Sequence, residues 1–156
     1  MKKSTKAKVI TTVITVVLIL AAGALAIFWA NNLPVNLDKQ YYDNAEIINI
    51  NKDDYEKLIA DKSSFLVMVD NAGCTTTERM REIMENLPQK FTYYRILWPE
   101  AKETNLESYV KYFPSLVVIE KGKVKYYLRA DSADDAKYYN NAEDLKTWLD
   151  SKINFS

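Results

Sequence analysis

A short apolar run near the middle of the chain leads through a turn into an amphipathic helix. The run spans Phe65 to Val69, which is typical of a buried strand. Residues 70–73 interrupt it, and Cys74, the only cysteine of the chain, follows directly. Beyond Cys74, the apolar residues recur at helical spacing until Pro88, which predicts a helix that ends there. These apolar residues are Met80, Ile83, Met84 and Leu87.

The sequence therefore places the thiol of Cys74 between the end of a buried strand and the first turn of a helix. Free backbone amides and the helix dipole favour a thiolate at such a position. Thr75 and Glu78 have the spacing of a capping box, so we expect a threonine side chain to cap this helix. A lone cysteine is also commonly a small buried hydrophobic residue, and both interpretations of Cys74 stay open.

A long uncharged segment near the N-terminus predicts a membrane anchor. Residues 9–30 contain no charged residue, and they follow a basic head, residues 1–8, which contains four lysines. The segment is long enough to cross a bilayer, and the lysines predict a cytoplasmic head with the rest of the chain outside. We therefore expect a single-pass protein of the cell membrane, held through Val9 to Ala30. The alternative is a signal peptide cleaved after Ala26, but the apolar run continues past that site, which favours the anchor.

The rest of the chain divides into a linker and one folded domain. Residues 31–44 are polar without periodicity, which predicts a linker, and residues 45–156 suffice for one core. The expected elements of this domain follow the order β-α-β-α-β-α-β-β-α. This order predicts an α/β fold with a central sheet covered by helices on both faces. Residues 130–140 form either a short helix capped by Ser132 or an acidic loop.

Composition excludes several classes of site. The chain has no histidine and one cysteine, which excludes a zinc site of the usual kind and catalysis by Ser-His-Asp or Cys-His groups. Its three glycines leave no phosphate-binding loop. Four of the 21 basic residues lie in the head, which leaves 17 against 21 acidic residues. We expect no metal, no cofactor and no nucleic acid as a partner, since the domain is slightly acidic.

Two stretches of the sequence resemble the thioredoxin family. The first is the unit of strand, Cys74 and helix. The second runs from Phe113 to Val124 and reads FPSLVVIEKGKV, similar to the family's cis-proline loop and the strand–turn–strand hairpin that follows it. The resemblance covers roughly Ala45 to Ser156. It implies a thioredoxin-like fold in which the Phe113–Pro114 bond is cis and Pro114 faces Cys74.

The active-site motif departs from the family pattern. The family has Cys-x-x-Cys, whereas residues 74–77 read Cys-Thr-Thr-Thr, so Thr77 stands where the resolving cysteine would be. Met68 stands in place of the family's buried acid, and Gly73 in place of its tryptophan. The resemblance implies that Cys74 is the catalytic residue. It also implies a groove for a protein or peptide partner, shaped by Gly73, Thr77, Phe113 and Pro114.

Three functions are compatible with this pattern. The first is a monothiol redox protein, in which Cys74 forms mixed disulfides that an outside thiol resolves. Dithiol oxidoreductase activity is not expected, because a chain with one cysteine forms no intramolecular disulfide. The second is a non-catalytic binding or accessory module for the secretion or assembly of partner proteins. The third is a structural subunit in which the fold only fills space.

Overall fold

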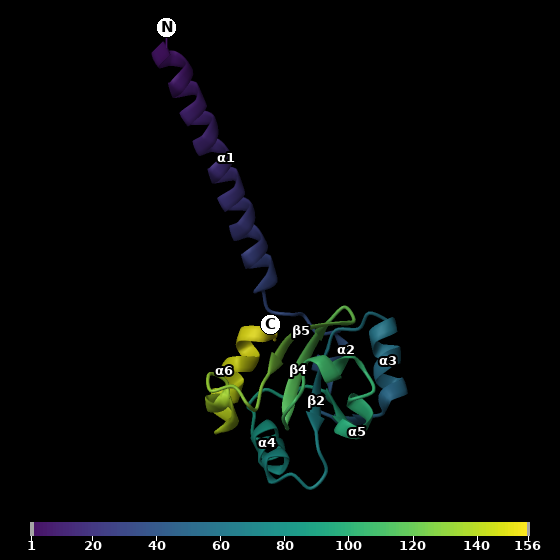
Figure 1. Ribbon diagram of the computed structural model, residues 1–156. Helices are drawn as coiled ribbons and strands as arrows, with labels where there is room; N and C mark the ends of the chain where they lie inside the picture. Colours follow the sequence, from purple (N-terminus) through teal and green to yellow (C-terminus); the bar gives the residue numbers. More distant parts are fainter. Residues whose placement is uncertain (1, 156) are drawn as a thin grey trace. The chain divides into compact units, whose positions relative to one another are not determined.

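The computed structural model describes residues 2–155, and the chain divides into an N-terminal unit up to Leu33 and a second unit from Pro34 onward. The N-terminal unit is the helix α1 (Lys2–Asn31). The second unit, called the domain below, contains the remaining elements (Figure 1). They are α2 (Gln40–Asp43), β1 (Ile47–Ile50), α3 (Lys52–Ala60), β2 (Phe65–Asp70), α4 (Thr75–Glu85), β3 (Tyr93–Leu97), α5 (Trp98–Ala101), the 3-10 helix η1 (Asn105–Ser108), β4 (Ser115–Glu120), β5 (Lys123–Leu128), the 3-10 helix η2 (Ala136–Tyr139) and α6 (Ala142–Lys152).

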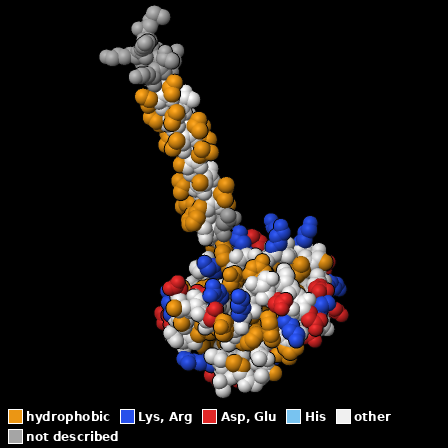
Figure 2. All heavy atoms as spheres, in the orientation of Figure 1, with side chains coloured by type: hydrophobic (Ala, Val, Ile, Leu, Met, Phe, Trp, Pro, Cys, Tyr) orange, Lys and Arg blue, Asp and Glu red, His pale blue; other side chains and the backbone are white. Residues whose placement is uncertain are grey.

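The helix α1 is long and apolar enough to cross a membrane over Val9–Ala30. Its large apolar side chains are exposed along this length, and Leu20 has an exposed fraction of 67%. Figure 2 shows hydrophobic side chains along the helix, whereas the domain carries interspersed acidic and basic groups. A signal sequence near the N-terminus passes the same test of length and composition, so the structure gives one candidate membrane span.

The domain is built on a five-stranded sheet of order β1-β3-β2-β4-β5. The pairs β1/β3 and β2/β3 are parallel, whereas β2/β4 and β4/β5 are antiparallel. Helices α4 and α6 cover one face of the sheet, and α3 and α5 cover the other (Figure 1). The predicted α/β sheet with helices on both faces is confirmed.

The two central strands are hydrophobic because both of their faces are covered. All residues of β2 are buried, and all of β4 are buried except the last. On the face covered by α3, the ring of Phe65 packs edge-on against Tyr94 and Tyr55, with centroid distances of 5.3 and 6.1 Å. Burial on both faces explains why the sequence of β2 is a continuous apolar run without alternation.

The linker expected over residues 31–44 differs in the structure, because most of it, from Pro34 onward, is part of the folded domain. Val35 is fully buried, and its amide donates to the carbonyl oxygen of Lys152 at 2.8 Å. Tyr41 is also buried, and its hydroxyl lies 3.0 Å from that of Tyr94. These apolar residues are too widely spaced to give a periodic signal, so the sequence pattern did not reveal that they pack against the core.

Candidate thiol site

The turn after β2 places Cys74 at the start of α4. Gly73 has a φ of +75°, a conformation that glycine adopts without the steric cost of a side chain. The amide of Cys74 donates to the carbonyl oxygen of Asn71 at 3.3 Å, which closes the turn. The carbonyl oxygen of Cys74 then accepts from the amides of Thr77 and Glu78 at 3.0 and 3.3 Å. Cys74 itself is therefore the N-cap residue of α4.

The expected capping box at Thr75 and Glu78 is absent. The helix α4 begins one residue earlier than that box requires, and its N-cap residue makes no side-chain capping bond. The carboxylate of Glu78 instead pairs with Arg81, one turn further along the helix. No threonine side chain therefore accepts a capping bond from the first backbone N–H groups of α4, and these groups remain close to the thiol.

The thiol of Cys74 is partly exposed and has a lowered pKa. Its Sγ lies 3.0 Å from the hydroxyl oxygen of Thr76. The Thr76 hydroxyl is the largest cause of the lowered pKa of Cys74, followed by the backbone amide of Thr77. Both groups donate to a thiolate and stabilise it relative to the thiol. This arrangement raises the fraction of Cys74 that is nucleophilic near neutral pH.

Thr77, which the resemblance aligns with a second cysteine, lies in the first turn of α4 and is buried, with an exposed fraction of 2%. Its hydroxyl oxygen is one of four buried side-chain atoms that lack a hydrogen-bond partner within residues 2–155. The backbone bond from the Thr77 amide to the carbonyl of Cys74 keeps the two residues on the same helical turn. Thr77 therefore borders the thiol, but its hydroxyl cannot form a disulfide.

The loop before β4 lies at the same end of the sheet as Cys74. Val69 of β2 is paired with Ser115 of β4, so antiparallel pairing places Pro114 beside Asp70, where the turn to Cys74 begins. The Phe113–Pro114 peptide bond, for which we expected the cis form, is cis. The ring of Phe113 packs against Trp98 at a centroid distance of 5.1 Å. The fold thus brings this loop and the Cys74 turn to adjacent strand ends.

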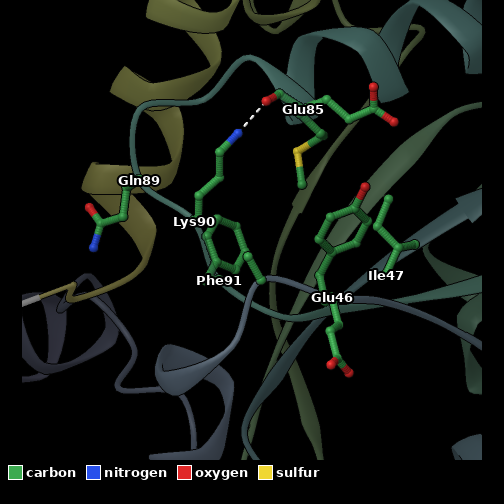
Figure 3. Close-up of a pocket in the computed structure, with 9 residues that line it drawn as sticks. Glu46, Ile47, Glu85, Gln89, Lys90 and Phe91 are labelled. Carbon is green, nitrogen blue, oxygen red and sulfur yellow. Dashed lines mark hydrogen bonds between the residues drawn. The ribbon is translucent and has the colours of Figure 1, made fainter.

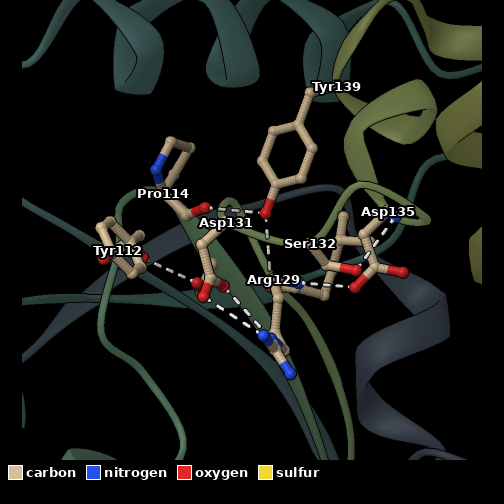
Figure 4. Close-up of polar contacts among 9 residues, drawn as sticks. Tyr112, Pro114, Arg129, Asp131, Ser132, Asp135 and Tyr139 are labelled. Atoms are coloured by element: carbon tan, nitrogen blue, oxygen red, sulfur yellow. Dashed lines mark hydrogen bonds and ion pairs between the residues drawn. The ribbon is translucent and has the colours of Figure 1, made fainter.

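Residues 130–140 support the loop that contains Pro114 (Figure 4). Their last part is the short helix η2, and Ser132 accepts a bond from the amide of Asp135 at 3.3 Å. The hydroxyl of Tyr139 donates to the carbonyl oxygen of Pro114 at 2.9 Å. Burial is the main cause of the raised pKa of Tyr139, so its hydroxyl stays protonated and able to donate. This segment is a folded support for the cis-proline loop, a role that the sequence did not reveal.

A polar cavity of about 170 Å³ lies beside the same loop. Aromatic rings and cationic side chains form much of its wall. It is lined by Tyr109, Lys111, Tyr112, Ser115, Tyr127, Arg129 and Asp131.

One buried ion pair at the base of the site was missed from the sequence. Asp70, the last residue of β2, is fully buried, and its Oδ2 accepts a bond from Nε of Arg95 on β3. The family resemblance directed attention to Met68, six residues before Cys74, whereas the acid stands four residues before it. The only signal was a carboxylate at the end of a buried apolar run.

In the described part of the chain, no group of three or more acidic or cysteine side chains has the arrangement of a metal site.

No protein-family model and no curated protein matches the sequence. Several solved thioredoxin structures match the fold. One is a chain in the crystal structure of the ferredoxin:thioredoxin reductase and thioredoxin f2 complex. It is 13% identical, with a TM-score of 0.51, and the match covers 69% of this chain and 94% of that chain. The reduced Schistosoma mansoni thioredoxin pre-protein is 13% identical, with a TM-score of 0.50 over 69% and 99% of the two chains. The long form of thioredoxin f from spinach chloroplast is 16% identical, with a TM-score of 0.50 over 76% and 96%. The domain therefore has the thioredoxin fold, with the one cysteine of the sequence at the start of α4.

Proposed function

We propose that this protein is anchored in the cell membrane and acts outside the cytoplasm through mixed disulfides formed by Cys74. The observation that carries the proposal is the partly exposed thiol at the start of α4, 3.0 Å from the Thr76 hydroxyl, with its lowered pKa. The partner is a protein or peptide that lies across the groove at this end of the sheet. We expect Gly73, Phe113 and Pro114 to line this groove, whereas Thr77 is buried and would act only from beneath the surface.

The reaction is a thiol–disulfide exchange. The Cys74 thiolate attacks one sulfur of a partner disulfide, a new S–S bond joins Cys74 to the partner, and the other partner sulfur leaves as a thiolate that takes a proton from water. The hydroxyl of Thr77 cannot displace this adduct. A second thiol of the partner, or a small-molecule thiol, then attacks the mixed disulfide and releases Cys74.

The proposed location rests on the N-terminal segment. The uncharged span Val9–Ala30 follows a head with four lysines, which favours a cytoplasmic N-terminus and an external domain. Disulfides form and persist in compartments outside the cytoplasm. An anchored domain there meets oxidised partners without diffusing away from the membrane.

A non-catalytic binding module is the second candidate, and the cavity beside the Pro114 loop favours it. This cavity does not involve the thiol, so it would accept a peptide side chain whether or not Cys74 reacts. Such a module would serve the secretion or assembly of partner proteins. Retained peptide binding by a Cys74→Ser variant, together with an unreactive thiol in the parent chain, distinguishes this function from the first.

Trapping adducts in intact cells tests the proposal. Cells that produce the full chain are treated with an alkylating agent to block exchange, and Cys74 adducts are separated without reductant and identified by mass spectrometry. We expect adducts that reductant releases and that are absent in Cys74→Ser. A Thr77→Cys variant supplies a resolving thiol, so its adducts should be fewer, and it should reduce insulin while the parent chain shows little turnover. Absence of Cys74-dependent adducts, or robust insulin reduction by the parent chain, would contradict the proposed mechanism.

A further inference from the structure

The strand β1 leaves one edge of the sheet open. It is the terminal strand in the sheet order, and the amide of Tyr93 on β3 donates to the carbonyl oxygen of Glu46 at 3.1 Å. In a parallel ladder, alternate residues face the neighbouring strand, so Ile48 and Ile50 bond toward β3. The N–H and C=O groups of Ile47 and Asn49 therefore point out of the sheet. An edge of this kind is a template for an added strand.

A hollow lies on each face of the sheet next to β1. The hollow on the α4 side, shown in Figure 3, has a volume of about 270 Å³ and apolar walls that include Ile47, Met84 and Phe91. The hollow on the α3 side has a volume of about 320 Å³ and is lined in part by Ile48 and Leu58. Successive side chains of a strand point to opposite faces. A strand added to β1 would therefore place its alternate side chains in the two hollows.

Both hollows have an acidic rim. Each has two carboxylates and one ammonium group, and the Lys90 ammonium in the first is bonded to the backbone carbonyl of Glu85 (Figure 3). Cationic side chains on an added strand would complement the excess of carboxylates. The charged residues are Glu46, Glu85 and Lys90 in the first hollow and Asp54, Asp61 and Lys57 in the second.

We propose that β1 binds an extended segment of a partner protein as a sixth strand, and that this segment combines apolar residues with lysine or arginine. Backbone bonds to Ile47 and Asn49 would hold the segment, and the two hollows would select its side chains. Edge-to-edge pairing of two copies of this chain is disfavoured, because each copy brings the same acidic rims and like charges oppose association. This surface is separate from the thiol site, since β1 and β4 are not neighbours in the sheet.

A peptide-binding experiment on the full chain tests this proposal. The chain is placed in nanodiscs of zwitterionic phosphatidylcholine, which do not attract cationic peptides electrostatically. The probe is a fluorescein-labelled octapeptide that alternates valine and lysine, and the control probe has glutamate in place of lysine. We expect the lysine peptide to bind about tenfold or more tightly than the glutamate peptide, and to slow amide hydrogen exchange at Ile47 and Asn49.

Two variants make the test specific to β1. Glu46→Lys combined with Asp61→Lys should weaken binding of the lysine peptide and strengthen binding of the glutamate peptide, whereas Asp134→Lys, at an exposed position on the 130–140 segment, should change neither. Unchanged affinities in the double variant, or exchange protection away from β1, would overturn the proposal. The proposal would also be overturned if the chain forms a dimer and the Ile47 amide is protected from hydrogen exchange in the absence of peptide. A second copy of the chain would then occupy the edge of β1.

Discussion

Removal of the Arg95 side chain should destabilise the domain strongly, because it leaves the buried Asp70 side chain without its ion-pair partner. Asp70 is fully buried, its Oδ2 is bonded to Arg95, and its Oδ1 has no hydrogen-bond partner. The Arg95 side chain is only 22% exposed, so water replaces little of the lost interaction. Breaking a buried pair by removing one partner costs about 3–5 kcal/mol. We expect Arg95→Met to lose this amount from a total unfolding free energy of about 5–15 kcal/mol.

Urea unfolding of the full chain in detergent micelles, followed by tryptophan fluorescence, measures this loss. The double variant Asp70→Leu/Arg95→Met should recover most of the stability, since replacement of both charges by apolar groups is commonly neutral or stabilising. Arg129→Met is the matched control. It breaks the more exposed pair with Asp131 and should cost far less than Arg95→Met, because exposed ion pairs contribute little to stability. A cost below about 1 kcal/mol for Arg95→Met would refute the argument, because it would mean that the Asp70 carboxylate does not depend on its partner.

Three further predictions follow from the same structure. Thr76→Val removes the largest cause of the lowered pKa of Cys74, so the midpoint of the pH–alkylation curve of Cys74 should move to higher pH. The control Thr75→Val should leave this midpoint in place. Equal midpoints in the two variants would contradict the prediction. Gly122→Ala should lower the thermal unfolding midpoint and cost about 1–3 kcal/mol of unfolding free energy. The reason is that Gly122 has a φ of +74°, and an added Cβ would lie 2.4 Å from the carbonyl oxygen of Ile59. An unchanged midpoint would contradict this prediction. Protease added outside intact cells should remove the domain and spare the basic head, whereas a free secreted form that begins after Ala26 would support a cleaved signal.

The elements with strong local signals could be predicted from the sequence. The buried run before Cys74 became β2, and Lys121-Gly122 separates β4 from β5. Asparagine is a preferred N-cap residue, and the side chains of Asn51 and Asn141 each accept a bond from the amide three residues later. In these cases the residues that decide the structure are neighbours in the sequence, so the pattern alone carries the information.

Other local predictions failed where packing decides the outcome. Thr104 and Glu107 have the spacing of a capping box, and Thr104 accepts a bond from the amide of Leu106 at 3.2 Å, but the helix that follows is a single 3-10 turn. The pattern at Thr75 and Glu78 suggested a cap for α4, but Cys74 takes that position. Val35 joins the core by pairing with Ile153, a partner so distant in sequence that no local pattern indicates the contact.

The candidate site was predictable in its backbone framework and not in its polar contacts. The family resemblance located Cys74 and Pro114 at the ends of their strands. The pairing of Asp70 with Arg95 depends on the register between β2 and β3. The bond from Tyr139 to Pro114 likewise depends on how a long connection folds back over the sheet. Sequence spacing does not specify either contact.

The pH dependence of Cys74 alkylation shows directly whether the fold activates this thiol. The rate is measured with iodoacetamide on the full chain, once folded in micelles and once unfolded in urea. The lowered pKa of Cys74 means that thiolate is present at lower pH in the folded chain, so its midpoint should lie below that of the unfolded chain. A folded midpoint equal to or above the unfolded one would contradict the claim.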